Sequence, residues 1–231
     1  MFTHYHKILL PLDGSPLAEH VLDHIGWLAA PAQTELCLVS VIESWRYAAA
    51  SPDFALADLI TPVRLGMQEY LQTQQTKLQA AGYQVATHVI EGDAASVILN
   101  LVQTEGIDLV AMSSHGRSGF VRWALGSVAE RVLRRATCPV LLMRPGVELP
   151  QQGFRRVLVP VDGSATSERV LQEILPYLAE EPQVVVMRAS GLTLQEHAQV
   201  LDPGARESYL LGLEASLADL KVEGLQLDIR G

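Results

Sequence analysis

A glycine-bearing stretch from Met112 to Arg144 contains the residues best suited to hold a small anion. It reads MSSHGRSGFVRWALGSVAERVLRRATCPVLLMR and joins the end of an expected strand to the start of an expected helix. Backbone N–H groups in such a loop, together with the positive dipole end of the following helix, form a natural phosphate cradle. Gly116, Gly119 and Gly126 permit close approach of the backbone to a ligand, and Ser127 can donate its hydroxyl. The stretch therefore predicts a phosphate-binding loop.

Ser127 also supports a second interpretation. Ser127-Val-Ala-Glu130 is a capping box, in which the serine caps its own helix, and the local sequence does not separate the two roles. No Gly-Lys-Ser/Thr follows the glycines, and no Gly-x-Gly-x-x-Gly follows the first apolar run. Ordinary P-loop and dinucleotide-binding folds are therefore disfavoured.

Five arginines gather around this stretch in a chain of net charge −9. They are Arg117, Arg122, Arg131, Arg134 and Arg135. We expect Arg117 to reach a phosphate with its forked guanidinium. The other four arginines are expected on solvated helix faces. His115, inside the loop, either donates to a phosphate or points to solvent. His20 and His24 are one helical turn apart without an evident third ligand, so a solvated helix face is expected there rather than a metal site.

The elements that must position these residues alternate along the chain. An apolar run before Asp13 predicts the first strand, and four more are expected at Glu35 to Ile42, Tyr83 to Ile90, Ile107 to Met112 and Pro139 to Met143. Helices are expected at Leu17 to Leu28, Val63 to Ala81, Asp93 to about Glu105 and Ser127 to Arg135, with Ser15 and Asp93 as caps. Residues 43–62 are expected to form a long connection. Five strands alternating with four helices favour a parallel sheet covered on both faces.

An internal repeat organises the rest of the chain. Lys7 to Ala30 and Arg156 to Ala179 agree at roughly ten of about 24 positions, and both contain Asp-Gly-Ser. The second copy predicts a strand at Val157 to Val161, a helix, and an apolar run at Gln183 to Ala189. A helix at about Pro203 to Leu220 and a strand at Leu225 to Ile229 follow. We therefore expect one domain at residues 1–145 and a partial second domain at 154–231 that lacks the glycine loop and the last two strands.

The composition narrows the classes of function. A chain of 231 residues that is 48% hydrophobic and 19% charged is expected to fold around a core. The charge of −9 disfavours general nucleic-acid binding. Cys37 and Cys138 are isolated thiols, which suggests a reducing compartment. With neither a signal peptide nor a stretch of about 18 apolar residues evident, we expect a cytoplasmic protein without a membrane partner.

The glycine stretch resembles the nucleotide loop of the universal stress protein family. That loop is Gly-x-x-Gly, nine residues, then Gly-Ser/Thr, and here it reads Ser113-x-x-Gly116, nine residues, Gly126-Ser127. Ser113 replaces the first glycine, which restricts the backbone but adds a hydroxyl that can contact phosphate. The PLDGS start, Glu91-Gly92-Asp93-Ala94 and the ATCPVLL ending also resemble the family. The resemblance covers nearly all of residues 5–145.

The resemblance implies an open five-stranded sheet of order 3-2-1-4-5 and a nucleotide crevice at its switch point. By similarity, Asp13 accepts hydrogen bonds from ribose hydroxyls, although an aspartate before Gly-Ser can also serve only to form a turn. Val41 lies against adenine, and Gly116, Gly126 and Ser127 hold the phosphates. The residues expected to contact the nucleotide are Pro11, Asp13, Gly14, Ser15, Val41, Met112, Ser113, His115, Gly116, Arg117, Gly126, Ser127 and Val128.

These expectations together describe an ATP-binding stress or signalling protein, with or without Mg²⁺. No carboxylate or histidine is obviously placed to activate a water, so no catalytic residue is assigned and any hydrolysis is expected to be slow. The alternatives are a nucleotide-dependent hydrolase or transferase and a nucleotide-free interaction module. The resemblance also implies a homodimer, paired through the fifth strand of the first domain.

Overall fold

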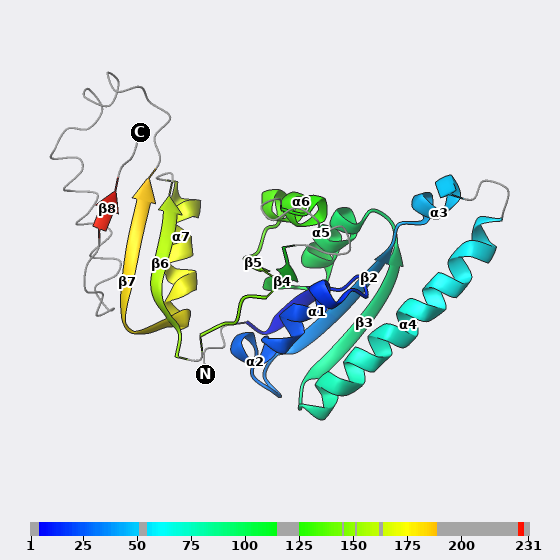
Figure 1. Ribbon diagram of the computed structural model, residues 1–231, viewed down its shortest axis with the longest axis horizontal. Coiled ribbons are helices and arrows are strands. Elements are labelled where there is room, and N and C mark those ends of the chain that lie inside the picture. The colour runs from blue at the N-terminus through cyan, green and yellow to red at the C-terminus, as the bar shows by residue number, and fades with distance from the viewer. Residues whose placement is uncertain are drawn as a thin grey trace, which may run out of the picture. The chain divides into compact units, whose positions relative to one another are not determined.

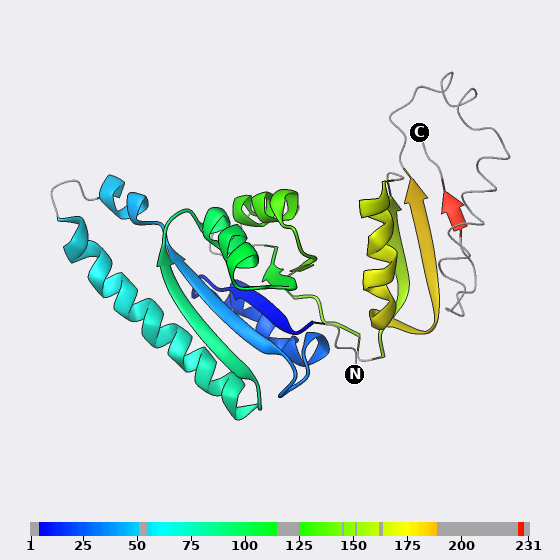
Figure 2. The same ribbon diagram turned by 180° about the vertical axis from the view of Figure 1, so that it is seen from behind.

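The computed structural model describes residues 5–50, 55–114, 125–144, 146–150, 152–161, 164–188 and 226–228. The chain divides into two compact units, residues 1–148 and 149–231. Figure 1 labels most of the helices and strands of both units, and Figure 2 shows them from behind. Each unit has its own sheet, so each is described separately.

The first unit is built on a sheet of five parallel strands. They are β1 (Lys7–Pro11), β2 (Glu35–Ile42), β3 (Gln84–Glu91), β4 (Leu109–Ser113) and β5 (Val140–Met143). Their order is β3-β2-β1-β4-β5, which confirms the order expected from the resemblance. The central strand β1 pairs with β2, where Lys7 lies opposite Glu35, and with β4, where Ile8 lies opposite Leu109. Its apolar run is continuous because side chains on both faces are buried.

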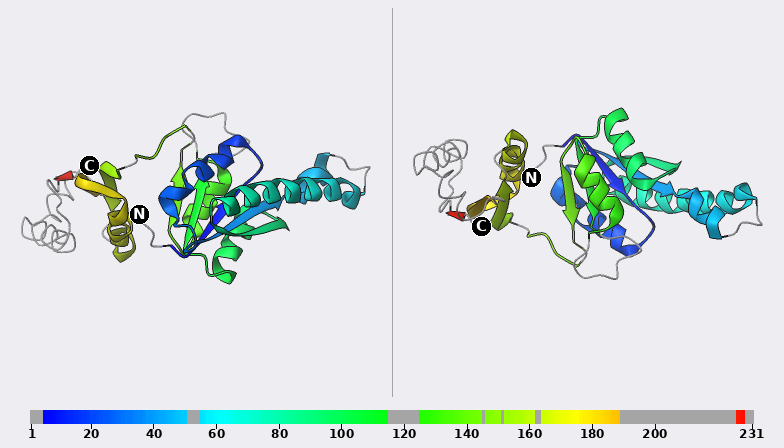
Figure 3. Two further views of the ribbon diagram at one scale, coloured as in Figure 1. Left: turned by 90° about the horizontal axis from the view of Figure 1, so that it is seen from below. Right: turned by 90° about the horizontal axis from the view of Figure 1, so that it is seen from above.

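Six helices accompany this sheet. They are α1 (Pro16–Asp23), α2 (Ile25–Leu28), α3 (Ser44–Ala50), α4 (Leu56–Ala80), α5 (Ala94–Thr104) and α6 (Ser127–Arg135). Helices α5 and α6 cover one face of the sheet and α1 and α4 the other (Figure 3). On the α5 and α6 face, Leu9, Val39 and Val110 form the core with Ile98 and Val132. In the described part of the chain, no helix combines the length and the apolar character needed to cross a bilayer.

Two helix predictions need correction. The helix expected at Leu17 to Leu28 is divided at His24, whose backbone leaves the helical region at φ −110° and ψ 10°. The helix expected from Val63 begins at Leu56 instead, and residues 44–50 form α3 within the expected long connection. Pro62 suggested a boundary, but it lies inside α4 on an exposed position. The apolar spacing of Leu56, Leu59, Ile60 and Val63 is that of a helix running through Pro62, so the later start was expected only because the proline was taken as a boundary.

Both cysteines are free thiols. Cys37 is fully buried in β2, and burial raises the pKa of its thiol to about 11. Burial also raises the pKa of the half-buried Cys138 thiol. Both thiols are therefore poor nucleophiles near neutral pH.

The second unit repeats the first half of this architecture. It contains β6 (Phe154–Val161), α7 (Ala165–Ile174), the short 3₁₀ helix η1 (Leu175–Tyr177), β7 (Leu178–Arg188) and β8 (Gln226–Asp228). Its parallel order β6-β7-β8 reproduces β1-β2-β3. Ser164 caps α7 by accepting a hydrogen bond from the Ser167 backbone N–H, as Ser15 caps α1 through Ala18. Strands β6 and β7 begin earlier than expected, and the helix expected at about Pro203 to Leu220 lies outside the described residues.

One ion pair joins α5 to α6. Arg131 of α6 donates two hydrogen bonds to Asp93, at 2.6 and 2.7 Å, and Asp93 also caps α5 by accepting from the Ser96 N–H at 3.0 Å. The Arg131 guanidinium, followed by the Ser96 hydroxyl and N–H that also donate to Asp93, holds the pKa of the Asp93 carboxyl well below its usual range. Arg131 is exposed, as expected for a solvated helix face, and it makes this ion pair in addition.

The same turn depends on Gly92, at the carboxyl end of β3. Gly92 has φ +150°, and an added Cβ would lie 3.0 Å from a side-chain carbon of Val97. Gly106, beyond the other end of α5, has φ +65° and open space around the added Cβ. We expect Gly106→Ala to lower the free energy of unfolding by about 1 kcal/mol through backbone strain alone. Gly92→Ala should lower it by roughly 2–4 kcal/mol, because contact and strain add.

Urea denaturation of both variants measures this difference. Gly106→Ala is the matched control, since it substitutes a positive-φ glycine beside the same helix without crowding. Equal losses for the two variants would contradict the crowding at Gly92.

Asp93→Asn isolates the charge of the α5–α6 ion pair, because asparagine is also a good helix cap. Asp93 has a lowered pKa in the folded state, so its contribution is complete above the unfolded value of about 3.9 and fades as pH falls below it. At pH 7 the variant should be less stable by about 0.5–1 kcal/mol, a small value because the pair is partly exposed. Unfolding curves at pH 7, 4 and 3 should show this gap narrowing at pH 3. A gap that is unchanged at pH 3 would show that the ion pair contributes nothing.

Candidate functional site

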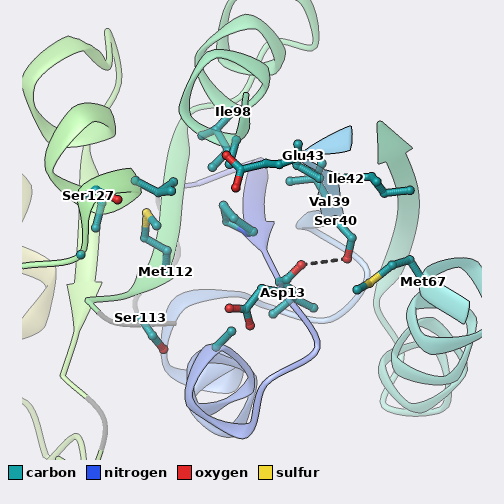
Figure 4. A pocket seen from close by; sticks show the side chains of 18 of the residues that line it. Asp13, Val39, Ser40, Ile42, Glu43, Met67, Ile98, Met112, Ser113 and Ser127 are labelled. Carbon is teal, nitrogen blue, oxygen red and sulfur yellow. Dashed lines mark hydrogen bonds between the residues drawn. The ribbon is translucent and has the colours of Figure 1, made fainter. Parts of the chain in front are cut away.

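A cavity of about 370 Å³ lies at the carboxyl ends of β1, β2 and β4 (Figure 4). Strands β2 and β4 flank β1 on opposite sides, so the chain reverses its direction across the sheet at this point. Eight of the residues expected to contact a nucleotide line it: Pro11, Asp13, Val41, Met112, Ser113, Gly126, Ser127 and Val128. The sheet therefore brings together segments that are about a hundred residues apart in sequence.

The β1 end of the cavity is a tight turn at Asp13. Asp13 Oδ1 accepts hydrogen bonds from the Ser15 N–H at 3.0 Å and the Ser15 hydroxyl at 2.6 Å. Gly14 has φ +77°, a conformation that favours glycine. Gly14 and Ser15 are not among the lining residues, and Ser15 is buried beneath the turn, where it caps α1. Asp13 thus forms the turn and also borders the cavity, and a carboxylate has room for further hydrogen bonds.

The β2 end is fixed against this turn by side-chain and backbone bonds. The Ser40 hydroxyl donates to the Leu12 carbonyl at 2.8 Å, shown dashed in Figure 4, and the Leu12 N–H donates to the Val39 carbonyl at 2.8 Å. Val41 follows on the cavity wall. These bonds hold Asp13 and Val41 on neighbouring walls of one cavity.

The β4 end leads to the amino end of α6. The Ser114 N–H donates to the Met143 carbonyl at 2.8 Å, and the Gly126 N–H donates to the Ser114 carbonyl at 3.0 Å. The two ends of the glycine stretch are thereby held together beside the cavity. His115, Gly116 and Arg117, which were expected to contact the nucleotide, lie outside the described residues, as do Gly119 and Arg122.

Helix α6 begins differently from the capping-box prediction. Gly126 is the N-cap, with φ −62° and ψ 144°, and Ser127 is the first helical residue. No side-chain bond caps the helix, and Glu130 instead accepts from Arg134 at 2.9 Å. The first N–H groups of an α-helix lack intrahelical acceptors, and among the described residues no side-chain cap serves the positive end of α6, which borders the cavity.

Ser113 is a buried polar residue of the cavity wall. It is the last residue of β4 and is 6% exposed. Its hydroxyl has no hydrogen-bond partner in the part of the chain that the structure describes. Buried hydroxyls in native proteins are nearly always paired, so this one requires an explanation.

Sequence patterns missed the wall that follows β2. Glu43, Arg46 and Tyr47 from the start of α3, and Val63 and Met67 from α4, also line the cavity. The Arg46 Nε donates to Glu43 at 2.7 Å, and the Glu43 side chain is only 16% exposed. The remaining unpredicted lining residues are Leu12, Ala18, Val39, Ser40, Ile42, Ala94, Ile98, Ser114 and Ala129. The position of the Glu43 carboxylate directly after a buried strand was the one sequence signal that could have placed it at this site.

The histidine pair on α1 also differs from expectation. The His20 and His24 side chains are 13% and 10% exposed, not solvated. Their rings meet edge to face, and Glu148 lies 3.8 Å from His24. Among the described residues no group of three or more histidine, cysteine, aspartate or glutamate side chains is placed to hold a metal ion.

Known proteins share this arrangement. The model of the universal stress protein family matches residues 4–144. Universal stress protein YxiE from Bacillus subtilis is 29% identical over 147 residues, which cover 61% of this chain and 99% of that protein. The solved structure of MJ0577, a universal stress protein of Methanocaldococcus jannaschii, is 26% identical with a TM-score of 0.56 and covers 62% of this chain and 99% of its own.

A likeness in fold also reaches the second unit. The structure of a universal stress protein from Archaeoglobus fulgidus, 24% identical with a TM-score of 0.67, covers 96% of this chain and 77% of its own. The family model matches more than half of the sequence. The chain therefore belongs to the universal stress protein family.

Proposed function

We propose that the first unit binds an adenine nucleotide, ATP in the first instance, in the cavity at the ends of β1, β2 and β4. The observation that carries this proposal is the amino end of α6, which borders the cavity without a side-chain cap. Such an end attracts phosphate. A cavity of about 370 Å³ at the switch point of a parallel sheet is within the range of small-molecule sites.

The proposed roles follow the family resemblance. Asp13 accepts hydrogen bonds from the ribose hydroxyls, and Val41 lies against adenine. The backbone around Gly126, Ser127 and Val128 holds the distal phosphates, together with His115, Gly116 and Arg117. Mg²⁺, where present, is held chiefly by the phosphates, which is its usual manner of binding beside a nucleotide.

We propose that ligand binding changes the protein surface and does not lead to a chemical product. The cavity wall includes Glu43 and Arg46 of the segment that leads into α3 and α4. A ligand that contacts this wall and the start of α6 links the segment after β2 to the segment after β4. A stress or signalling partner then recognises the altered surface. We propose a cytoplasmic role without nucleic-acid or membrane partners, in keeping with the net charge of −9.

The domain assignment belongs to the same proposal. Residues 1–145 form the nucleotide-binding domain, and residues 154–231 form a partial copy without a glycine loop.

Gly126→Asp tests the proposed phosphate site directly. An aspartate at the N-cap supplies its own acceptor to α6 and places a negative charge where the phosphates are proposed to bind. Affinity for ATP, measured by isothermal titration calorimetry, should fall at least tenfold, while the unliganded variant should be as stable as the wild type or slightly more so. Gly126→Asn is the matched control, since it caps the helix at nearly equal volume without charge and should retain more affinity than the aspartate.

Mass spectrometry of ligand released from the purified wild-type chain accompanies this titration. Recovery of an adenine nucleotide supports the proposal, and ATP affinity equal in wild type and Gly126→Asp contradicts it. Turnover of bound ATP at a steady rate would favour the hydrolase or transferase alternative. Absence of any nucleotide binding would favour the interaction module.

We also propose a homodimer that pairs the β5 strands of two chains. Strand β5 is at the edge of the first sheet and pairs with β4 only. The carbonyls of Pro139 and Met143 accept hydrogen bonds from the N–H groups of Val110 and Ser114, on the β4 side. Backbone polar groups of successive strand residues point to alternate sides, so those of Val140 and Leu142 face away from β4. These outward groups are available to a second strand.

Val140→Pro should therefore weaken the dimer. Proline removes the outward N–H of residue 140, and the first residue of a strand tolerates proline best. Light scattering coupled to size exclusion should give a dimer mass for wild type and a monomer mass for the variant at the same concentration, with the circular dichroism spectrum retained. A wild type that is monomeric at all concentrations, or a variant that dimerises equally well, would exclude the β5 interface.

A further inference from the structure

The buried hydroxyl of Ser113 borders the cavity proposed to hold the nucleotide. Ser113 ends β4, which pairs with β1, the strand that leads to Asp13. The next residue, Ser114, accepts a hydrogen bond from the Gly126 N–H at the start of α6. Ser113 therefore lines the cavity where the strand beside the Asp13 turn passes into the segment bonded to Gly126. Figure 4 shows Asp13, Ser113 and Ser127 around the same cavity.

Burial makes the hydroxyl informative. Ser113 is 6% exposed, lines the cavity, and has no hydrogen-bond partner in the described ranges of the chain. Burying a hydroxyl without a partner is unfavourable, whereas alanine at the same place would carry no such penalty. We therefore expect a ligand in the cavity to supply the hydrogen-bond partner that this hydroxyl lacks.

We propose that Ser113 is a ligand-contacting residue whose hydroxyl donates a hydrogen bond to the phosphate nearest the ribose. The inference rests on the proposed nucleotide site and specifies which part of the ligand this chain recognises with a side chain. The family motif has glycine at this position and offers only backbone there, so the contact is particular to chains with a hydroxyl residue. Ser113 thereby distinguishes nucleotides, which carry that phosphate, from nucleosides.

The proposal and a purely structural role predict opposite effects on the unliganded protein. If Ser113 awaits a phosphate, Ser113→Ala removes an unpaired polar group, and the unliganded variant unfolds at the same temperature as wild type or higher. If the hydroxyl stabilises the fold, the same variant unfolds at a lower temperature. Ser113→Gly restores the residue typical of the family motif and tests the loss of the hydroxyl a second time.

The experiment is calorimetric titration of the full chain with ATP, AMP and adenosine, together with thermal unfolding of each unliganded protein. Ser113→Ala and Ser113→Gly are compared with wild type and with Thr73→Ala, which removes an exposed hydroxyl on α4 at a position that does not line the cavity. We expect both Ser113 variants to lose roughly tenfold in affinity for ATP and AMP alike, since one bond to a charged oxygen is removed. Affinity for adenosine should not change.

Three results would overturn the inference for Ser113 while leaving nucleotide binding intact. They are unchanged affinity for ATP and AMP, an equal loss for adenosine, and a lower unfolding temperature of unliganded Ser113→Ala. A loss for ATP but not AMP would also overturn it, because the contact would then be with a distal phosphate. Failure of the wild type to bind any of the three ligands would instead remove the proposed function itself.

Discussion

Strand β1 pairs with β2 on one side and β4 on the other, and the candidate site depends on this central position. Parallel strands end at the same edge of a sheet, so the turn after β1, the end of β2 and the glycine stretch after β4 must converge there. Neither the Asp13 turn nor the start of α6 forms a cavity alone. The fully buried residues Leu9 and Val110, which face each other across β1 and β4, hold the two halves in register.

The cavity wall contains polar groups whose hydrogen-bonding capacity is not satisfied within the described residues. The start of α6 has no side-chain cap, and the Ser113 hydroxyl has no partner in the described part of the protein. Side chains cap α1 through Ser15, α5 through Asp93 and α7 through Ser164, whereas α2 and α4 begin without a side-chain cap, as α6 does. What distinguishes α6 is that its uncapped start borders the cavity.

Much of the fold was predictable because its strands are buried on both faces. The apolar run Glu35–Ile42 was predicted with its observed bounds, and α6 was predicted at Ser127–Arg135. The break at His24 was not predictable, since it does not change the apolar pattern. The start of α4 was expected too late because Pro62 was taken as a boundary, although Leu56, Leu59 and Ile60 keep the helical spacing. For the site, motif resemblance identified the Asp13 and Ser127 walls. The Glu43 wall was missed because its placement depends on α3, a helix set by tertiary contacts rather than by sequence period.

The central claim is that main-chain amides at the start of α6 bind phosphate. The most direct measurement is an NMR titration of ¹⁵N-labelled protein with ATP, following the amide resonances of residues 126–129. The account predicts that the amides of Gly126, Ser127 and Val128 shift first and furthest, in proportion to occupancy, because each lies at the helix end that borders the cavity. Saturable shifts elsewhere in the first unit, with these amides unchanged, would contradict it.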